Sequence, residues 1–213
     1  DAVRDELDGA QITTYEITEY TDKDVREMFR RLNSGKGLNT SQKLTPDMSD
    51  ELSDAISEIT ALPFFEKRLS GAQLNSSVDQ TVALEILMFC ATNKDREFTS
   101  FTGKDRKNFI KYYNDKVESD KISLIKDAIN KLDASLEDEV KIPKTSISVL
   151  CYASYIMLKD KKSYEKFALK VVEFITDYDN NTEYKDKLSN GTNSSEAVKY
   201  RFAYWRNILK EIG

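Results

Sequence analysis

The chain has 213 residues, of which 39% are hydrophobic and 32% charged, and its formal net charge is −5. This length suits one domain, or one domain with a small subdomain, and an acidic protein as a whole does not attract nucleic acid. The absence of histidine excludes a Ser-His-Asp triad, a Cys-His pair, a histidine zinc site and a histidine-dependent nuclease. A Mg²⁺ site built from carboxylates alone remains open.

The first predicted elements are a strand and a helix. Residues 12–20, ITTYEITEY, are rich in β-branched and aromatic side chains and predict a short β-strand. Residues 21–33 predict a helix, because apolar residues recur on one face at i, i+3, i+4 and i+7: Val25, Met28, Phe29 and Leu32. We expect Asn33 or Gly35 to end this helix, since both residue types tolerate positive φ.

The rest of the chain is predicted to be helical, so the fold class is mainly α, a bundle of about 8–9 helices with the short strand at its N-terminal end. Two segments, residues 76–92 and 145–158, are almost wholly apolar and predict central, buried helices. The polar residues 179–195 predict a flexible loop. We expect residues 1–45 and residues 46–213 to form two parts, the second all-helical.

The segment RRLNSGKGLN, residues 30–39, is the main candidate for an anion site. From Arg30 to Lys43 there are four basic residues and no acidic one. Backbone N–H groups of a glycine-rich loop and of a helix start can hold a phosphate. The candidate phosphate- or DNA-binding residues are Arg30, Arg31, Asn33, Ser34, Gly35 and Lys36. The alternative interpretation is a helix end, with solvated or paired arginines.

Three other segments have a functional and a structural interpretation. Residues 199–210 hold the only tryptophan and make Arg201 and Arg206 secondary candidates for nucleic-acid binding; a terminal helix that packs on the bundle is the alternative. Residues 103–116 mix basic and aromatic side chains, which suits single-stranded nucleic acid; an amphipathic helix is the preferred interpretation, because Asp105 and Asp115 dilute the positive charge. The acidic residues 135–141 offer carboxylates for a metal, yet their spacing matches no known loop, and a solvated turn is the default.

The order of strand, helix and glycine-containing loop resembles the second half of the ParB-like domain of GmrSD- and SspE-type proteins, the DGQQR family. The family pattern is matched by Phe29, Arg31, Leu32, Asn33, Gly35 and Leu38. The DGQQR motif itself does not occur in this chain. The resemblance therefore implies a C-terminal part of such a domain, with residues 1–45 as the remnant of a ParB/sulfiredoxin-like core that contains the strand, the helix and the loop.

The function implied by the resemblance is a part in nucleotide-dependent DNA processing or phage defence, with the loop contributing to a phosphate or DNA site. We expect no activity from this chain alone, no cofactor within it, and NTP and Mg²⁺ in the full-length protein. DNA is the expected partner of residues 30–43, with another protein or the missing N-terminal part as further partners. The alternative function is a non-catalytic helical module for protein interaction.

The cellular location follows from the cysteines and from hydropathy. Cys90 and Cys151 stand in apolar runs and are expected to be reduced. No apolar run approaches the roughly 20 residues that span a bilayer, so no membrane partner is expected. These features favour a cytoplasmic protein.

Overall fold

The computed structural model describes residues 18–21, 24–25, 28, 44–94 and 96–212. The chain divides into two units, residues 1–36 and residues 37–213. In the first unit, Thr21 begins a helical turn: its side chain accepts a hydrogen bond from the Asp24 N–H at 3.3 Å, and its own N–H donates to the Asp24 carboxylate at 2.9 Å. The predicted strand is not seen at residues 18–20, and its remainder, residues 12–17, lies outside the described residues.

The second unit is helical, as predicted, with ten α-helices in its described residues. A short 3-10 helix, η2 (Thr45–Asp47), precedes them. The α-helices are α4 (Asp50–Thr60), α5 (Pro63–Arg68), α6 (Gly71–Asn75), α7 (Val78–Ala91), α8 (Gly103–Tyr113), α9 (Ser119–Asp133), α10 (Lys144–Lys159), α11 (Tyr164–Thr176), α12 (Thr182–Ser189) and α13 (Ser195–Glu211).

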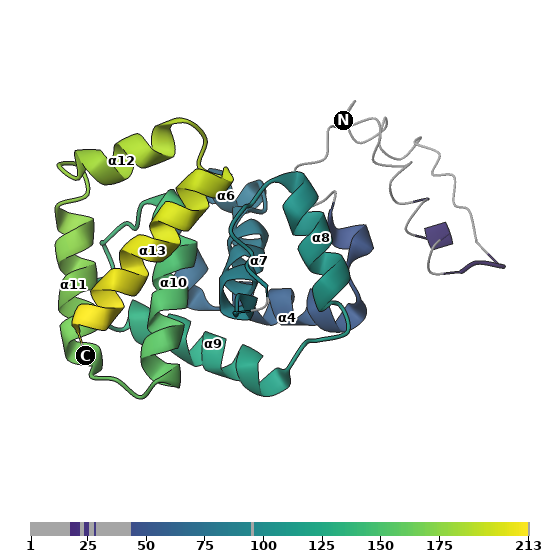
Figure 1. Ribbon diagram of the computed structural model, residues 1–213. Helices are drawn as coiled ribbons and strands as arrows, with labels where there is room; N and C mark the ends of the chain where they lie inside the picture. Colours follow the sequence, from purple (N-terminus) through teal and green to yellow (C-terminus); the bar gives the residue numbers. More distant parts are fainter. Residues whose placement is uncertain (1–17, 22–23, 26–27, 29–43, 95, 213) are drawn as a thin grey trace, which may run out of the picture. The chain divides into compact units, whose positions relative to one another are not determined.

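Helix α10 is the centre of this unit, and α7, α9, α11 and α13 pack around it (Figure 1). Its sequence explains this position, because apolar and small residues occupy nearly every turn and the helix is buried on all sides. Helix α7 has the same character, with residues 82–89 buried without interruption. The two central helices are those that the apolar runs predict.

The outer helices each bury one stripe, as their sequence period dictates. In α4 the buried residues are Leu52, Ala55, Ile56 and Ile59, and in α9 they are Ile122, Ile125, Ala128, Ile129 and Leu132. Both sets recur at i, i+3, i+4 and i+7, the spacing of one helical face. Helix α4 packs on α7 and α9, and α5 also packs on α9.

The prediction of a flexible loop at residues 179–195 is wrong for its middle part, which forms α12. Asn181 begins the helix, since its side-chain oxygen accepts a hydrogen bond from the Tyr184 N–H at 3.1 Å. Tyr184 and Leu188, four residues apart, are buried, and α12 packs on α13 (Figure 1). Two apolar anchors one turn apart are therefore enough to fix a helix whose other residues are polar.

The core face of α13 is not the one that the spacing of its apolar residues suggests. The sequence suggests a face through Tyr200, Ala203, Tyr204 and Ile208, whereas the buried residues are Ala197, Val198, Arg201, Phe202, Trp205 and Leu209. Ala203 is exposed. The fully buried Trp205 decides the register, because its ring packs edge-on against Phe167 and Phe174 of α11 at 6.2 and 5.2 Å between centroids.

Within the described residues, no helix combines the length and the apolar character needed to cross a membrane. Cys90 and Cys151 are both free thiols. Burial raises the pKa of each thiol above its usual range.

Candidate functional site

The six residues of the predicted phosphate loop, Arg30, Arg31, Asn33, Ser34, Gly35 and Lys36, lie outside the described residues. The secondary candidates Arg201 and Arg206 are both on α13, but in opposite environments. Arg201 is only 2% exposed, whereas Arg206 is exposed.

Arg201 links two segments that are far apart in the sequence, the start of α10 and the loop before α13. Its guanidinium donates to the carbonyl of Thr145 at 2.5 Å and to the carbonyl of Thr192 at 2.6 Å. It also lies over the Phe101 ring, 5.6 Å from the centroid. Burial lowers the pKa of this guanidinium, although the nearby Glu85 carboxylate acts in the opposite direction. The side chain thereby joins the start of α10 to the loop before α13.

Arg206, by contrast, lines an open pocket of about 450 Å³, which we call the basic pocket. Its walls come from the segment after α7, from α10 and the turn that follows it, and from α13. Among the described lining residues, five side chains are cationic and two are carboxylates: Lys94, Lys159, Lys162, Arg206 and Lys210, with Glu97 and Asp160. This surplus of cations contrasts with the net charge of −5 for the whole chain.

Three of these cations are positioned by uncharged groups. The Arg206 guanidinium lies over the Phe202 ring, 5.3 Å from its centroid. The Lys159 ammonium lies 5.9 Å from the Tyr155 ring centroid, and Lys162 Nζ donates to the Leu209 carbonyl at 3.0 Å. Since these partners carry no net negative charge, they orient the cations without neutralising them.

No carboxylate in the described part of the chain lies within 4.0 Å of the charged nitrogens of the five pocket cations. Outside the pocket, eight of the sixteen described lysines have such a carboxylate partner, as Lys126 has Glu58 at 2.8 Å. The unpaired cations of the basic pocket therefore keep their charge available for a ligand.

Helix ends explain part of this concentration of charge. The C-terminal ends of α7, α10 and α13 all contribute lining residues, namely Thr92, Asp160 and Lys210. A helix C-terminus carries about half a negative charge, which nearby lysines stabilise. Three such ends offset about one and a half of the surplus of three positive charges, so about one and a half remain.

The floor of the basic pocket is aromatic and rigid. Phe202 stacks on Tyr152 of α10 with centroids 5.0 Å apart, and on Phe89 of α7 with centroids 5.4 Å apart. Tyr152 and Phe202 are 7% and 8% exposed. The planar guanidinium of Arg206 is thus supported from below by packed rings, while the side chain itself stays accessible to solvent.

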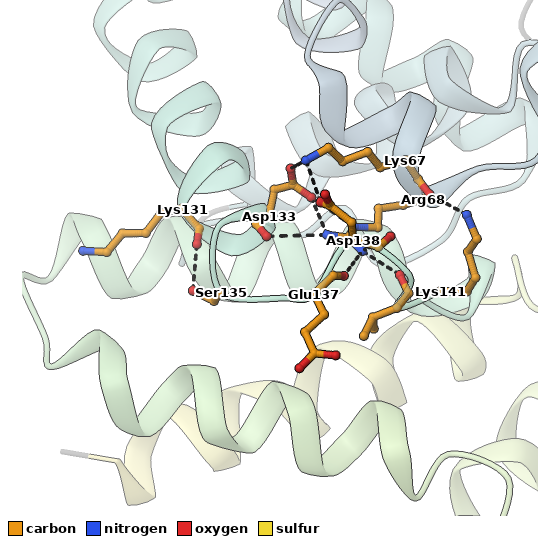
Figure 2. A network of polar contacts seen from close by, with 9 residues as sticks. Lys67, Arg68, Lys131, Asp133, Ser135, Glu137, Asp138 and Lys141 are labelled. Carbon is orange, nitrogen blue, oxygen red and sulfur yellow. Dashed lines mark hydrogen bonds and ion pairs between the residues drawn. The ribbon is translucent and has the colours of Figure 1, made fainter.

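The acidic segment 135–141 is organised by an arginine (Figure 2). Arg68 Nη2 lies 2.6 Å from the Asp133 carboxylate, and Arg68 Nη1 donates to the carbonyls of Glu137 and Val140, each at 2.7 Å. In the described residues, no group of three or more His, Cys, Asp or Glu side chains is placed to hold a metal ion. The segment is therefore a loop wrapped around a buried cation.

The segment 103–116 forms the amphipathic helix that was one of its two interpretations. Phe109, Ile110 and Tyr113 of α8 are buried. Arg106 is buried as well and pairs with Glu85 of α7 at 2.6 Å. Arg106 Nε has no hydrogen-bond partner among the described residues.

Several residues of the basic pocket were not found from the sequence: Lys94, Lys159, Lys162, Lys210 and Tyr152. They come from elements far apart in the chain, and no spacing pattern connects them. The usable signal was the position of Lys159 directly after the predicted helix of residues 145–158, because cations gather at helix C-termini.

Comparison with protein-family models, with curated proteins and with solved structures finds no match to this chain. The candidate site is accordingly argued from its own geometry.

Proposed function

We propose that this chain is the helical part of a nucleotide-dependent DNA-processing protein, and that its basic pocket binds phosphate groups of nucleic acid. The observation that carries the proposal is the set of unpaired cations around one hollow in an acidic protein. Phosphate contacts from Lys and Arg supply most of the sequence-independent affinity for nucleic acid. The loop of residues 30–36 would add a second phosphate contact, as its resemblance to the ParB-like pattern implies.

The proposal is tested by reversing charge in the pocket. We expect Arg206→Glu with Lys210→Glu to weaken binding of a fluorescein-labelled 20-nucleotide single strand by at least about tenfold, because two phosphate-binding cations become repulsive anions. Fluorescence anisotropy at low and moderate salt measures this affinity.

The matched control is Lys166→Glu with Lys199→Glu, which makes the same change in net charge at two exposed lysines outside the basic pocket. A control that weakens binding as much as the pocket variant would mean that only the net charge matters, and the pocket would not be the site.

Stabilisation of helix ends is the competing role for Lys159 and Lys210. That role predicts that Lys159→Gln with Lys210→Gln lowers the melting temperature and leaves affinity for the strand unchanged. The proposal predicts weaker binding as well, so thermal melting and anisotropy on this variant distinguish the two roles.

The loop is tested separately with Asn33→Ala and Lys36→Ala in the full-length protein. We expect weaker nucleotide binding and slower turnover in both variants. Unchanged affinity and turnover in both would remove the loop from the proposal and leave the pocket to be judged by the strand-binding assay.

The proposal includes NTP and Mg²⁺ as ligands of the full-length protein. It also includes a cytoplasmic location for that protein. The free thiols Cys90 and Cys151 support that location.

A non-catalytic role in protein interaction is the second candidate function. Leu169 and Val172, which share one face of α11, are 60% and 43% exposed. A partner captured by the wild-type chain and lost with Leu169→Glu, combined with no binding of nucleic acid, would favour this second function.

A further inference from the structure

The basic pocket is small and bounded, and we infer that it binds a phosphate monoester, the terminal phosphate of a nucleic-acid strand, in preference to phosphodiesters within the strand. This inference rests on the proposed function and goes further, because it states which kind of phosphate the pocket selects. Three observations carry it: the limited volume of the pocket, the loss of surplus positive charge beyond Glu97, and the amount of positive charge among the described lining residues.

A hydrogen bond links two walls of the pocket, and the pocket has a limited volume. Lys162, in the turn after α10, donates from Nζ to the Leu209 carbonyl in the last turn of α13 at 3.0 Å. This contact joins two of the pocket's walls. Its volume of about 450 Å³ lies in the range of sites for small molecules. A long strand needs an extended groove that follows its backbone.

The positive region also ends on the side of Glu97. This residue lines both the basic pocket and a neighbouring hollow of about 420 Å³. The neighbouring hollow has one cation, Arg96, and two carboxylates, Glu97 and Asp105. Hydrogen bonds from Thr102 and Ser100 lower the pKa of Asp105, which keeps it ionised. Counted in the same way, the N-terminal ends of α8 and α13 at this hollow, each about half a positive charge, bring its sum close to zero, so a strand that continued past Glu97 would leave the surplus of positive charge.

The remaining charge suits one terminal phosphate. After the three helix C-termini are counted, about one and a half positive charges are left over among the described lining residues. A phosphate monoester carries about −1.5 to −2 at pH 7, whereas each internal phosphodiester carries about −1 and strand-binding proteins contact several of them. Arg206, whose guanidinium lies over the Phe202 ring, has the planar fork that can pair with two oxygens of one phosphate.

The test compares single strands that differ only at one end. The 213-residue chain is titrated into a 3′-fluorescein-labelled 20-nucleotide strand with a 5′-phosphate or a 5′-hydroxyl, and anisotropy is recorded. We expect the 5′-phosphorylated strand to bind at least about fivefold tighter, because the extra charge and oxygens reach the pocket. Arg206→Gln with Lys210→Gln should abolish this ratio, and Lys166→Gln with Lys199→Gln should preserve it.

A phosphate monoester can also belong to a free nucleotide, and competition separates the two sources. AMP that displaces the phosphorylated strand, with adenosine inactive, supports recognition of the monoester and assigns it to a small molecule. Displacement only by phosphorylated strands supports recognition of a strand end.

Equal affinity for the phosphorylated and unphosphorylated strands would overturn the inference. The proposed function would still hold in that case if the pocket charge-reversal variant lost affinity for both strands. Absence of binding to every strand and to AMP would overturn the inference and the proposed function together.

Discussion

Two arginines five residues apart on α13 have opposite roles, and helix geometry gives the reason. Five residues correspond to about 140° around a helix, so Arg201 and Arg206 cannot share a face. Trp205 places Arg201 inward, where it hydrogen-bonds to backbone carbonyls, and leaves Arg206 on the rim of the basic pocket. Residue type alone made them equal candidates, and burial separates a structural cation from an available one.

This contrast predicts unequal effects on stability. We expect Arg201→Ala to lower the free energy of unfolding by at least about 2 kcal/mol, because a side chain that is 2% exposed and its hydrogen bonds to the carbonyls of Thr145 and Thr192 are lost. Arg206→Ala removes a cation–π contact at an exposed site and should cost about 0.5–1 kcal/mol. Urea unfolding followed by circular dichroism measures both values. Similar losses in the two variants would contradict the assigned roles.

Asp105 gives a pH-dependent prediction at the same scale. Hydrogen bonds from Thr102 Oγ1 at 2.5 Å and Ser100 Oγ at 2.7 Å lower its pKa in the folded chain. A carboxyl whose pKa is depressed by folding contributes stability above its unfolded pKa, about 3.9, and this contribution is lost as the pH falls through the folded pKa. Asp105→Asn should therefore be less stable than wild type at pH 7, with a difference that shrinks below about pH 4.

Thermal melting between pH 3 and 7 checks this prediction. Asp127→Asn on α9 is the control for loss of an exposed carboxylate. A stability difference for Asp105→Asn that stays constant over the whole range would contradict the assigned cause.

At the scale of elements, periodic apolar residues predicted the long helices. The short helix α12 lacks such a period and was not predicted. Helix α9 has an apolar residue at every turn of its buried face, whereas α12 has only Tyr184 and Leu188. A polar segment held by two anchors looks like a loop until its packing partner, α13, is known. The basic pocket could not be predicted from the sequence either, because its cations come together only when α7, α10 and α13 pack.

The loop between α9 and α10 gives the prediction at this scale. Arg68→Ala should lower the free energy of unfolding by about 3–5 kcal/mol, because it leaves the Asp133 carboxylate and several loop carbonyls without their buried donor. Lys67 pairs with Asp133 and Asp138 but is 40% exposed. Lys67→Ala should therefore cost at most about 1 kcal/mol. Chemical denaturation of both variants is the measurement, and a smaller loss for Arg68→Ala than for Lys67→Ala would show that the loop does not depend on Arg68.

At the scale of the whole molecule, a net charge of −5 coexists with a hollow in which cations outnumber carboxylates. Such an arrangement repels long polyanions from most of the surface and leaves, in the described part of the chain, a place where negative charge is favoured. Local charge, more than net charge, therefore decides which anions this protein can bind. Because a ligand that binds only the folded chain stabilises it, anion binding can be measured through the free energy of unfolding.

Inorganic phosphate should stabilise the folded chain through the basic pocket. A ligand present at ten times its Kd adds about 1.4 kcal/mol to the free energy of unfolding, which corresponds to a rise of about 3–6 °C in the melting temperature for a domain of this size. Phosphate also strengthens burial of apolar surface in any protein, so wild type must be compared with variants at equal ionic strength. Arg206→Gln with Lys210→Gln should lose most of the rise, and Lys166→Gln with Lys199→Gln should retain it. The same rise in all three proteins would assign the effect to general solvation and leave the pocket without a role in anion binding.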